Sequence, residues 1–165
     1  MLEENLIIKR LKQRFSTGIL KGDLSSDMPV ITVERSMIHE VIHFLREEED
    51  MGYTFLTTLC GIHYPDEPLP LGVVYHLHNM EQRKRIRIKT FVPLEEPHLS
   101  TITDIFSAAN WMERETYDFY GIIFDGHPNL IRILNVAYLD YFPLRKEYPL
   151  EDPTREDKDD RYFGR

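Results

Sequence analysis

Apolar residues recur at helical spacing in three stretches of the chain, with charged residues between them. These stretches predict helices over residues 3–15, 36–50 and 101–120, the last as one or two helices. Ser36 is the expected N-cap of the second helix. Asn110 and Glu113 have the spacing of a capping box, which predicts that a helix begins again at Trp111.

Four further segments are short and rich in β-branched or aromatic residues, which is typical of strands. The predicted strands cover residues 29–33, 53–64, 71–78 and 83–92. The short link at residues 79–82 predicts a hairpin between the last two. In the last strand Arg85, Arg87 and Lys89 alternate with apolar residues, so one face of the sheet is expected to be basic.

Helices at both ends of a run of antiparallel strands predict an α+β fold. We expect a two-layer sandwich, in which a mixed or antiparallel sheet packs against helices, with an extended C-terminal tail. The expected domain covers residues 1–137 and the tail covers residues 138–165. Prolines and mixed charges interrupt the tail, and Leu144 and Leu150 are too few to form a core. The tail is therefore expected to need another surface to order it.

The composition limits the chemistry that this chain can perform alone. Its 165 residues carry a formal net charge of -8 and a single cysteine, Cys60. One cysteine forms no intrachain disulfide and holds no iron–sulfur cluster or four-cysteine zinc site. The sequence contains neither the dinucleotide-binding motif GxGxxG nor the phosphate-binding motif GxxxxGK[ST]. The sequence shows no signal peptide and no apolar run of membrane-spanning length, so a cytosolic location is expected.

His39, Glu40 and His43 match the H-E-x-x-H pattern of zinc proteases. Histidines four residues apart share a helix face and can bind one zinc ion, while the glutamate activates the bound water. However, Arg46 and Glu49 replace the glycine and the third histidine of the longer motif. The pattern also lies opposite the apolar face, which favours a solvated helix surface. A small zinc metalloprotease stays the alternative hypothesis.

The basic run at residues 83–89 is long enough to contact nucleic acid or anionic lipid. No row of aromatic residues accompanies it, and the net charge has the wrong sign for a nucleic-acid binder. A solvated face or a contact with a partner protein is favoured, and no nucleic-acid partner is expected.

The most unusual stretch covers residues 110–121. On a helical wheel Glu115 and Asp118 lie on either side of Trp111, on what is expected to be a packing face. Buried carboxylates need cations or hydrogen-bond donors. Three interpretations stay open, namely ion pairs with Arg114 or Arg132, a face completed by another protein, and a pair of acid–base carboxylates.

This stretch also carries a family resemblance. Its run Glu-Arg-Glu-x-x-Asp-Phe-Tyr-Gly is followed by Phe-x-Gly-His-Pro-x-Leu and then by Arg-Ile-Leu. Together they resemble the signature of the C subunit of the proton-pumping NADH-quinone oxidoreductase, respiratory complex I. The likeness covers residues 53–150 and includes the segment 143–149, Pro-Leu-Arg-Lys-Glu-Tyr-Pro.

The resemblance implies a structural subunit of the hydrophilic arm of that complex, fed by NADH or another donor. Such a subunit carries no flavin, no iron–sulfur cluster and no catalytic residue, since FMN and the clusters belong to other subunits. It would pack on the D subunit, which helps form the quinone site, and lie near the cluster-bearing subunits. It would be peripheral on the cytoplasmic side of the cell membrane, which it would meet only through the complex.

Eight charged or histidine residues are expected to form partner interfaces or to order segments of the chain. They are Glu113, Arg114, Glu115, Asp118, His127, Arg132, Arg145 and Lys146.

Overall fold

The computed structural model describes residues 6–24 and 27–149. Three α-helices are present in this part of the chain, with two 3₁₀ helices and seven strands. The helices are α1 (Leu6–Phe15), η1 (Ser16–Gly18), η2 (Arg35–Met37), α2 (Ile38–Glu47) and α3 (Ala109–Tyr120). The strands are β1 (Ile19–Asp23), β2 (Val30–Val33), β3 (Phe55–His63), β4 (Leu71–Asn79), β5 (Lys84–Val92), β6 (His98–Ser100) and β7 (Ile123–Asp125).

Five strands form one mixed sheet in the order β1-β2-β5-β4-β3. The β2–β5 pair is parallel and the other three pairs are antiparallel. The predicted hairpin is present, because Asn79 pairs with Lys84 across the turn. β6 and β7 form a separate parallel pair. The predicted α+β class with a mixed sheet is therefore confirmed.

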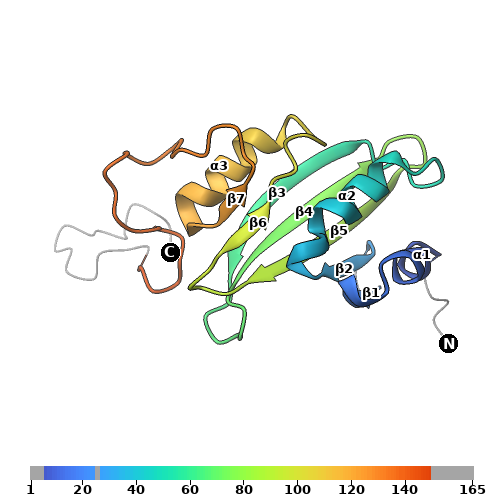
Figure 1. The fold of residues 1–165 in the computed structure, drawn as a ribbon, viewed down its shortest axis with the longest axis horizontal. Coiled ribbons are helices and arrows are strands. Elements are labelled where there is room, and N and C mark those ends of the chain that lie inside the picture. Colours follow the sequence, from blue (N-terminus) through green and yellow to red (C-terminus); the bar gives the residue numbers. More distant parts are fainter. Residues whose placement is uncertain (1–5, 25–26, 150–165) are drawn as a thin grey trace, which may run out of the picture.

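All three helices lie on one face of this sheet. α2 lies over the sheet (Figure 1) and buries Val41, Ile42 and Leu45 in the same core as the inward-facing Tyr75 and Ile88. This arrangement forms the two layers that the sequence predicts.

The other two helices approach the sheet at glycines whose missing side chains would point to that face. A β-carbon added at Gly22 would lie 2.7 Å from Ile8 of α1, and one added at Gly61 would meet Tyr120 of α3. The register pairs Gly22 with the buried Ile31 and Gly61 with the buried Val73. The opposite face of the sheet therefore carries no helix from the described part of the chain.

Two helix starts differ from the prediction. The second helix begins as η2, and the N-cap there is Glu34, whose side chain accepts a hydrogen bond from the backbone N–H of Ser36. Ser36 is therefore not the cap. In the third stretch only Ala109–Tyr120 is helical, and the residues before it form turns. The capping box is wrong because the carboxylate of Glu113 points instead into the core.

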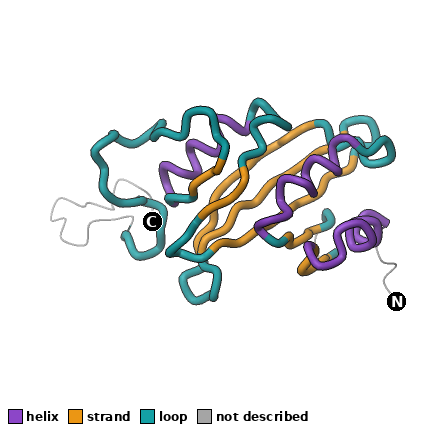
Figure 2. Tube along the Cα trace, viewed as in Figure 1, coloured by secondary structure: helices purple, strands orange, loops and turns teal. Residues whose placement is uncertain are grey.

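After β7 the chain runs as one long loop beside α3 (Figure 2). The backbone N–H of Leu144 donates to the carbonyl of Phe119 at 3.2 Å, so the loop returns to the end of α3. The expected tail of residues 138–165 thus begins with a segment that touches its own domain, while Leu150 and the residues after it lie outside the described residues. The division at residue 137 stays a prediction.

Candidate functional site

Asp118 lies fully buried in the last turn of α3, where the loop after β7 closes over it. Its Oδ2 accepts hydrogen bonds from the backbone N–H groups of Ile133, Leu134 and Asn135 at 3.1, 2.8 and 2.8 Å. Its Oδ1 pairs with Arg132 at 2.8 Å. Burial alone would raise the pKa of Asp118, but the N–H donors and the guanidinium hold that pKa well below its usual value. The carboxylate therefore stays charged and fixes the shape of the loop.

Arg132 binds the same loop from the other side. One terminal nitrogen donates to the carboxylate and the carbonyl of Asp118, and the other donates to the carbonyls of Leu139 and Tyr141 at 2.8 and 3.0 Å. The guanidinium also lies over the ring of Phe142, 5.1 Å from its centroid. One side chain thus holds the helix end and two later carbonyls in a single arrangement.

Arg145 takes the second position at the same ring. Its guanidinium lies 4.6 Å from the centroid of Phe142, and its Nε donates to the carbonyl of Tyr120 at 2.8 Å. The backbone N–H of Lys146 donates to Nδ1 of the buried His63 at 2.9 Å. Lys146 is itself exposed, and this contact uses its backbone rather than its ammonium group.

Gly121 allows this packing at the C-terminus of α3. It adopts a φ of 74° as the C-cap, a conformation that side chains disfavour. A β-carbon there would also lie 2.5 Å from the ring of Phe142 and 2.7 Å from the guanidinium of Arg145. A glycine directly after a helical stretch predicts a C-cap from the sequence alone. The contact of Gly121 with Phe142 cannot be predicted in this way.

Glu113 is the buried carboxylate on the core-facing side of α3, and it is fully inaccessible. It accepts hydrogen bonds from the backbone N–H of Ile102 at 2.8 Å and from Oγ1 of Thr101 at 2.6 Å. Burial raises the pKa of Glu113 to about 7, partly offset by these two donors, and Asp104 adds a small repulsion. This carboxyl group therefore orders the turn before α3 and titrates near neutrality.

Arg114 and Glu115 behave differently from their neighbours. Arg114 donates to the carbonyls of Ile131 and Arg132 at 3.1 and 3.2 Å, and so supports the loop from its outer side. Glu115 is exposed, and so is Trp111, with 59% of its surface accessible. The expected packing face was therefore wrong at these two positions. The stripe that α3 buries in the core contains Ala109, Glu113 and Thr116 instead.

His127 holds the start of the loop against the start of α3. Its Nε2 donates to the carbonyl of Asn110 at 3.1 Å, and its Nδ1 accepts from the backbone N–H of Asn129 at 3.0 Å.

The eight expected residues therefore divide into three groups. The side chains of six contact backbone groups that shape the turn before α3, the end of α3 or the loop after it. These six are Glu113, Arg114, Asp118, His127, Arg132 and Arg145. Lys146 contributes its backbone N–H, and for Glu115 the structure places no such contact.

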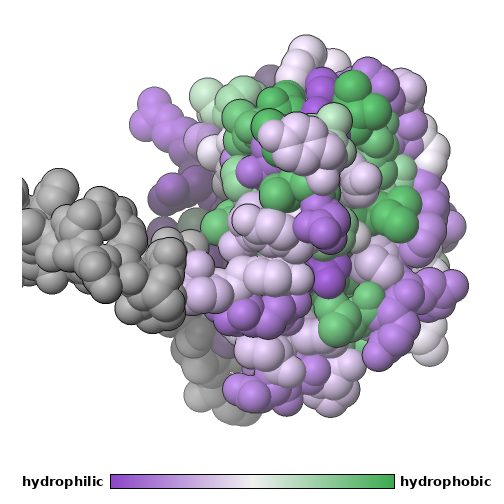
Figure 3. All heavy atoms as spheres, turned by 90° about the vertical axis from the view of Figure 1, so that its left-hand side faces the viewer, coloured by the Kyte–Doolittle hydropathy of each residue, from purple (hydrophilic) through white to green (hydrophobic). Residues whose placement is uncertain are grey.

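The loop presents apolar side chains outward while its backbone is held inward. Tyr138 is 86% exposed and Leu134 is 64% exposed. We call the exposed apolar residues between positions 131 and 138 of this loop the apolar ridge: Ile131, Ile133, Leu134, Val136 and Tyr138. Figure 3 faces the side of the molecule where the loop lies, and shows apolar residues at several places among polar ones. Isolated exposed apolar residues are common on proteins, but several on one ordered loop are typical of an interaction surface.

The H-E-x-x-H residues do not come together as a metal site. His39 Nε2 lies 2.8 Å from Asp104 Oδ2, and the rings of His39 and His43 stack with centroids 6.4 Å apart. Among the described residues, no three histidine, cysteine, aspartate or glutamate side chains are placed to hold a metal ion. The zinc protease alternative therefore has no support in this part of the structure.

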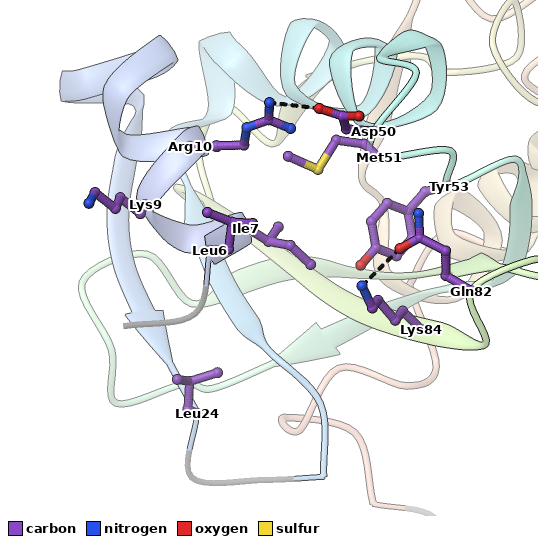
Figure 4. A pocket seen from close by; sticks show the side chains of 10 residues that line it. All are labelled: Leu6, Ile7, Lys9, Arg10, Leu24, Asp50, Met51, Tyr53, Gln82 and Lys84. Carbon is purple, nitrogen blue, oxygen red and sulfur yellow. Dashed lines mark hydrogen bonds and ion pairs between the residues drawn. The ribbon is translucent and has the colours of Figure 1, made fainter. Parts of the chain in front are cut away.

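A separate hollow of about 1130 Å³ lies between α1 and the hairpin of β4 and β5 (Figure 4). Two pairs of side chains interact in this hollow: Arg10 binds Asp50 at 2.8 Å, and Lys84 donates to Gln82 at 2.8 Å. Its described lining contains no histidine or cysteine. The titratable side chains of this lining are Lys9, Arg10, Asp50, Tyr53 and Lys84, and the aspartate is already paired with Arg10.

Comparison with known proteins links this architecture to one family. The family described as the 30 kDa subunit of respiratory-chain NADH dehydrogenase matches residues 31–154. Among similar curated proteins, the C subunit of the NADH-quinone oxidoreductase of Citrifermentans bemidjiense is 37% identical, covering 94% of this chain and 96% of that protein. The corresponding C subunit of Herpetosiphon aurantiacus is 38% identical, covering 91% of this chain and 86% of that protein.

Two solved structures have the same fold. The trypsin-resistant fragment of Nqo5 superposes with a TM-score of 0.63 at 32% identity, covering 76% of this chain and all of that one. A chain of an archaeal membrane-bound sulfane sulfur reductase superposes with a TM-score of 0.72 at 23% identity, covering 87% of this chain and 84% of that one. Within the described residues, no helix is long and apolar enough to cross a membrane.

Proposed function

This chain belongs to the family of the 30 kDa subunit of respiratory-chain NADH dehydrogenase, and from that premise we propose that it is a structural subunit of a quinone-reducing, ion-translocating oxidoreductase. Its relatives are subunits of the NADH-quinone oxidoreductase, an enzyme complex. In this proposal the chain holds no cofactor, and FMN and iron–sulfur clusters belong to other subunits. NADH or another donor supplies the electrons.

The use of charge in the site supports a scaffolding role. The carboxylate of Asp118 accepts four hydrogen bonds and Arg132 donates four, all within the chain. A catalytic acid, base or anion-binding group needs hydrogen-bonding positions that are free to contact a substrate. The hydrogen bonds of Asp118 and Arg132 go to the loop and the helix end instead. What the arrangement offers to the outside is the surface of the loop.

We propose that the apolar ridge docks on the D subunit, which we call the quinone-site subunit, with cluster-bearing subunits nearby. The single observation that carries this proposal is a loop whose backbone is fixed by Asp118 and Arg132 while Leu134 and Tyr138 point outward. A surface that is already ordered loses little conformational entropy on binding, and apolar or aromatic anchors contribute most of an interface's energy. The chain would then sit peripherally, on the cytoplasmic side of the cell membrane, through the complex alone.

The experiment introduces a charge on the ridge. Leu134→Asp is expected to reduce the amount of the quinone-site subunit that co-purifies with the tagged chain from solubilised membranes. The expected loss is about tenfold or more, the factor that ~1.4 kcal/mol corresponds to. Leu20→Asp is the matched control, since Leu20 is 60% exposed and lies on β1, outside the ridge. Recovery of the quinone-site subunit with Leu134→Asp at the control level would refute docking through the ridge.

A further inference from the structure

We propose that the helix-free face of the five-stranded sheet is a second docking surface, which binds an acidic segment of another protein through a row of cations beside an apolar pocket. The inference rests on the proposed function only for the expectation that this protein is a subunit of the same assembly. The surface consists of Lys21, Arg85, Arg87 and Lys89 with the pocket next to them, and we call it the basic sheet face.

Register aligns two of these cations across neighbouring strands. Lys21 of β1 pairs with Thr32 of β2, and Thr32 pairs with Lys89 of β5. Neighbouring strands lie about 4.8 Å apart, so the two lysine Cα atoms lie about 10 Å apart on one side of the sheet. No carboxylate of the described residues forms an ion pair with either ammonium group. Two unpaired charges of one sign thus border the same threonine.

The row of cations continues along β5, where carboxylates neutralise little of the positive charge. Arg87 donates from its Nε to Nε2 of His76 at 2.8 Å, a neutral partner whose pKa is lowered by burial and by the neighbouring arginines. Arg85 lies 3.5 Å from Asp27, an ion pair between exposed side chains. Such pairs contribute little and leave the cation available. In a chain of net charge -8 this concentration of cations on one face needs a reason.

A pocket of about 440 Å³ opens between the two lysines and the loop that joins β3 to β4. The rings of Tyr64 and Phe91 lie 6.2 Å apart on its wall, and Leu69 lines it with 42% of its surface exposed. Glu67 is the one acidic residue in the described lining. Such a pocket can accept an apolar side chain of a partner protein, while carboxylates of the same partner segment contact the lysines at the pocket edge.

Gly72 shapes the wall of this pocket. It pairs with Phe91, and a β-carbon on it would lie 2.7 Å from the aromatic ring. Because the glycine has no side chain, the ring lies across β4 and widens the apolar surface. An aromatic pocket wall of this kind is not expected on a sheet face that contacts only water.

The chemistry of the surface favours an acidic polypeptide as the occupant. Carboxylates complement Lys21, Lys89 and Arg87, and an apolar side chain fills the pocket, which gives an apolar anchor inside a charged rim. Nucleic acid fits less well, because its affinity comes from neutralising many phosphates while the whole chain is acidic. The two rings are also tilted by 38° to each other on the pocket wall, and do not form a row for stacking bases.

The test measures lysine reactivity in the purified complex. An amine-acylating reagent is applied, and the modified fraction of each lysine is determined by mass spectrometry. Lys21 and Lys89 are expected to react about tenfold more slowly than the exposed Lys9 of α1, the factor that ~1.4 kcal/mol of protection corresponds to. A carbodiimide, which joins amines to carboxylates at zero length, is expected to link Lys21 or Lys89 to an aspartate or glutamate of one other subunit.

Two variants separate this surface from the ridge. Leu69→Asp puts a carboxylate at the pocket without removing a cation, and is expected to restore the reactivity of Lys89 and abolish the cross-link. The quinone-site subunit is expected to stay bound to this variant through the ridge. Leu134→Asp, in contrast, is expected to release the quinone-site subunit without creating a charge at the pocket.

Equal reactivity of Lys21, Lys89 and Lys9 in an intact complex would overturn the inference while the proposed function stands. Protection that disappears on nuclease treatment or lipid extraction would overturn it as well. If the tagged chain recovers no other complex subunit, the proposed function itself fails.

Discussion

Arg132 donates to both the carboxylate and the backbone carbonyl of Asp118, at 2.8 Å each. The pair joins the last turn of α3 to a loop residue that lies 14 positions further along the chain. Because Asp118 is fully buried, water does not replace either partner when the other is removed. This relationship ties the stability of the domain to the shape of its proposed interface.

Asp118→Asn is expected to destabilise the chain by about 3–5 kcal/mol, the range for breaking a buried ion pair on one side. The amide nitrogen would face N–H groups or a guanidinium, so at least one donor would lose its acceptor. Urea unfolding of the purified chain measures the change. Glu115→Gln is the control, since Glu115 is exposed and should shift stability by no more than about 0.5 kcal/mol. Equal effects of the two substitutions would show that the hydrogen bonds and the ion pair of Asp118 do not stabilise the chain.

Glu113 is expected to make stability fall as the pH rises through the range from about 4.5 to about 7. Its pKa of about 7 in the folded chain lies above the ordinary value of 4.5, so the folded state binds the extra proton in this range. Stability is therefore highest below the unfolded pKa and lower above the folded one, by a few kcal/mol in all. Glu113→Gln mimics the protonated form and should flatten this part of the profile.

Urea unfolding at a series of pH values measures the slope. Asp118 does not contribute to it, because its lowered pKa affects stability only where the pH falls below its unfolded value near 3.8. A slope that is the same in Glu113→Gln and the natural chain would contradict the assignment to Glu113.

Gly121→Ala is expected to loosen the segment around Phe142. The substitution places a β-carbon at positive φ, which costs about 1 kcal/mol, and pushes against the ring of Phe142. Trypsin should cleave after Arg145 faster in this variant, because its guanidinium loses the ring and the helix end together.

Gly126→Ala provides a matched comparison for the backbone cost. Gly126 has a φ of 85°, but an added β-carbon would meet only Thr101, at 3.3 Å. It should therefore share the loss of stability without the faster cleavage. Equal cleavage in both variants would mean that the packing at Phe142 does not hold the segment.

The sequence predicted the long elements of the sheet because their patterns are long. β3, β4 and β5 each cover nine residues of alternating or apolar character. β6 and β7 cover three residues each, too few to show a period, and they pair only because the fold brings them together. The basic face of β5 was predicted correctly, since alternation in a strand fixes which residues share a side.

The site was predicted in part. The pairing of Asp118 with Arg132 was among the interpretations left open, but Trp111 misled the assignment of the buried face. A large aromatic residue usually marks the core, and here it is exposed. Glu113 was among the residues expected to order a segment, but its burial and its partners were not predicted. These partners, Thr101 and Ile102, lie before α3 in a stretch that helical periodicity extended into a helix. Contacts between a helix and a distant loop leave no periodic pattern in a sequence.

The parallel pairing of β2 with β5 also has a consequence for biosynthesis. Val30 pairs with Arg87, so the first strands of the sheet leave the ribosome well before the strand that completes them. The hairpin of β4 and β5 closes locally, whereas docking of the N-terminal hairpin bridges a long stretch of chain and is entropically slower. We therefore expect the pairing of β2 with β5 to be the last step in forming the sheet. In a nascent chain halted before residue 92, β1 and β2 are expected to be accessible to chaperones.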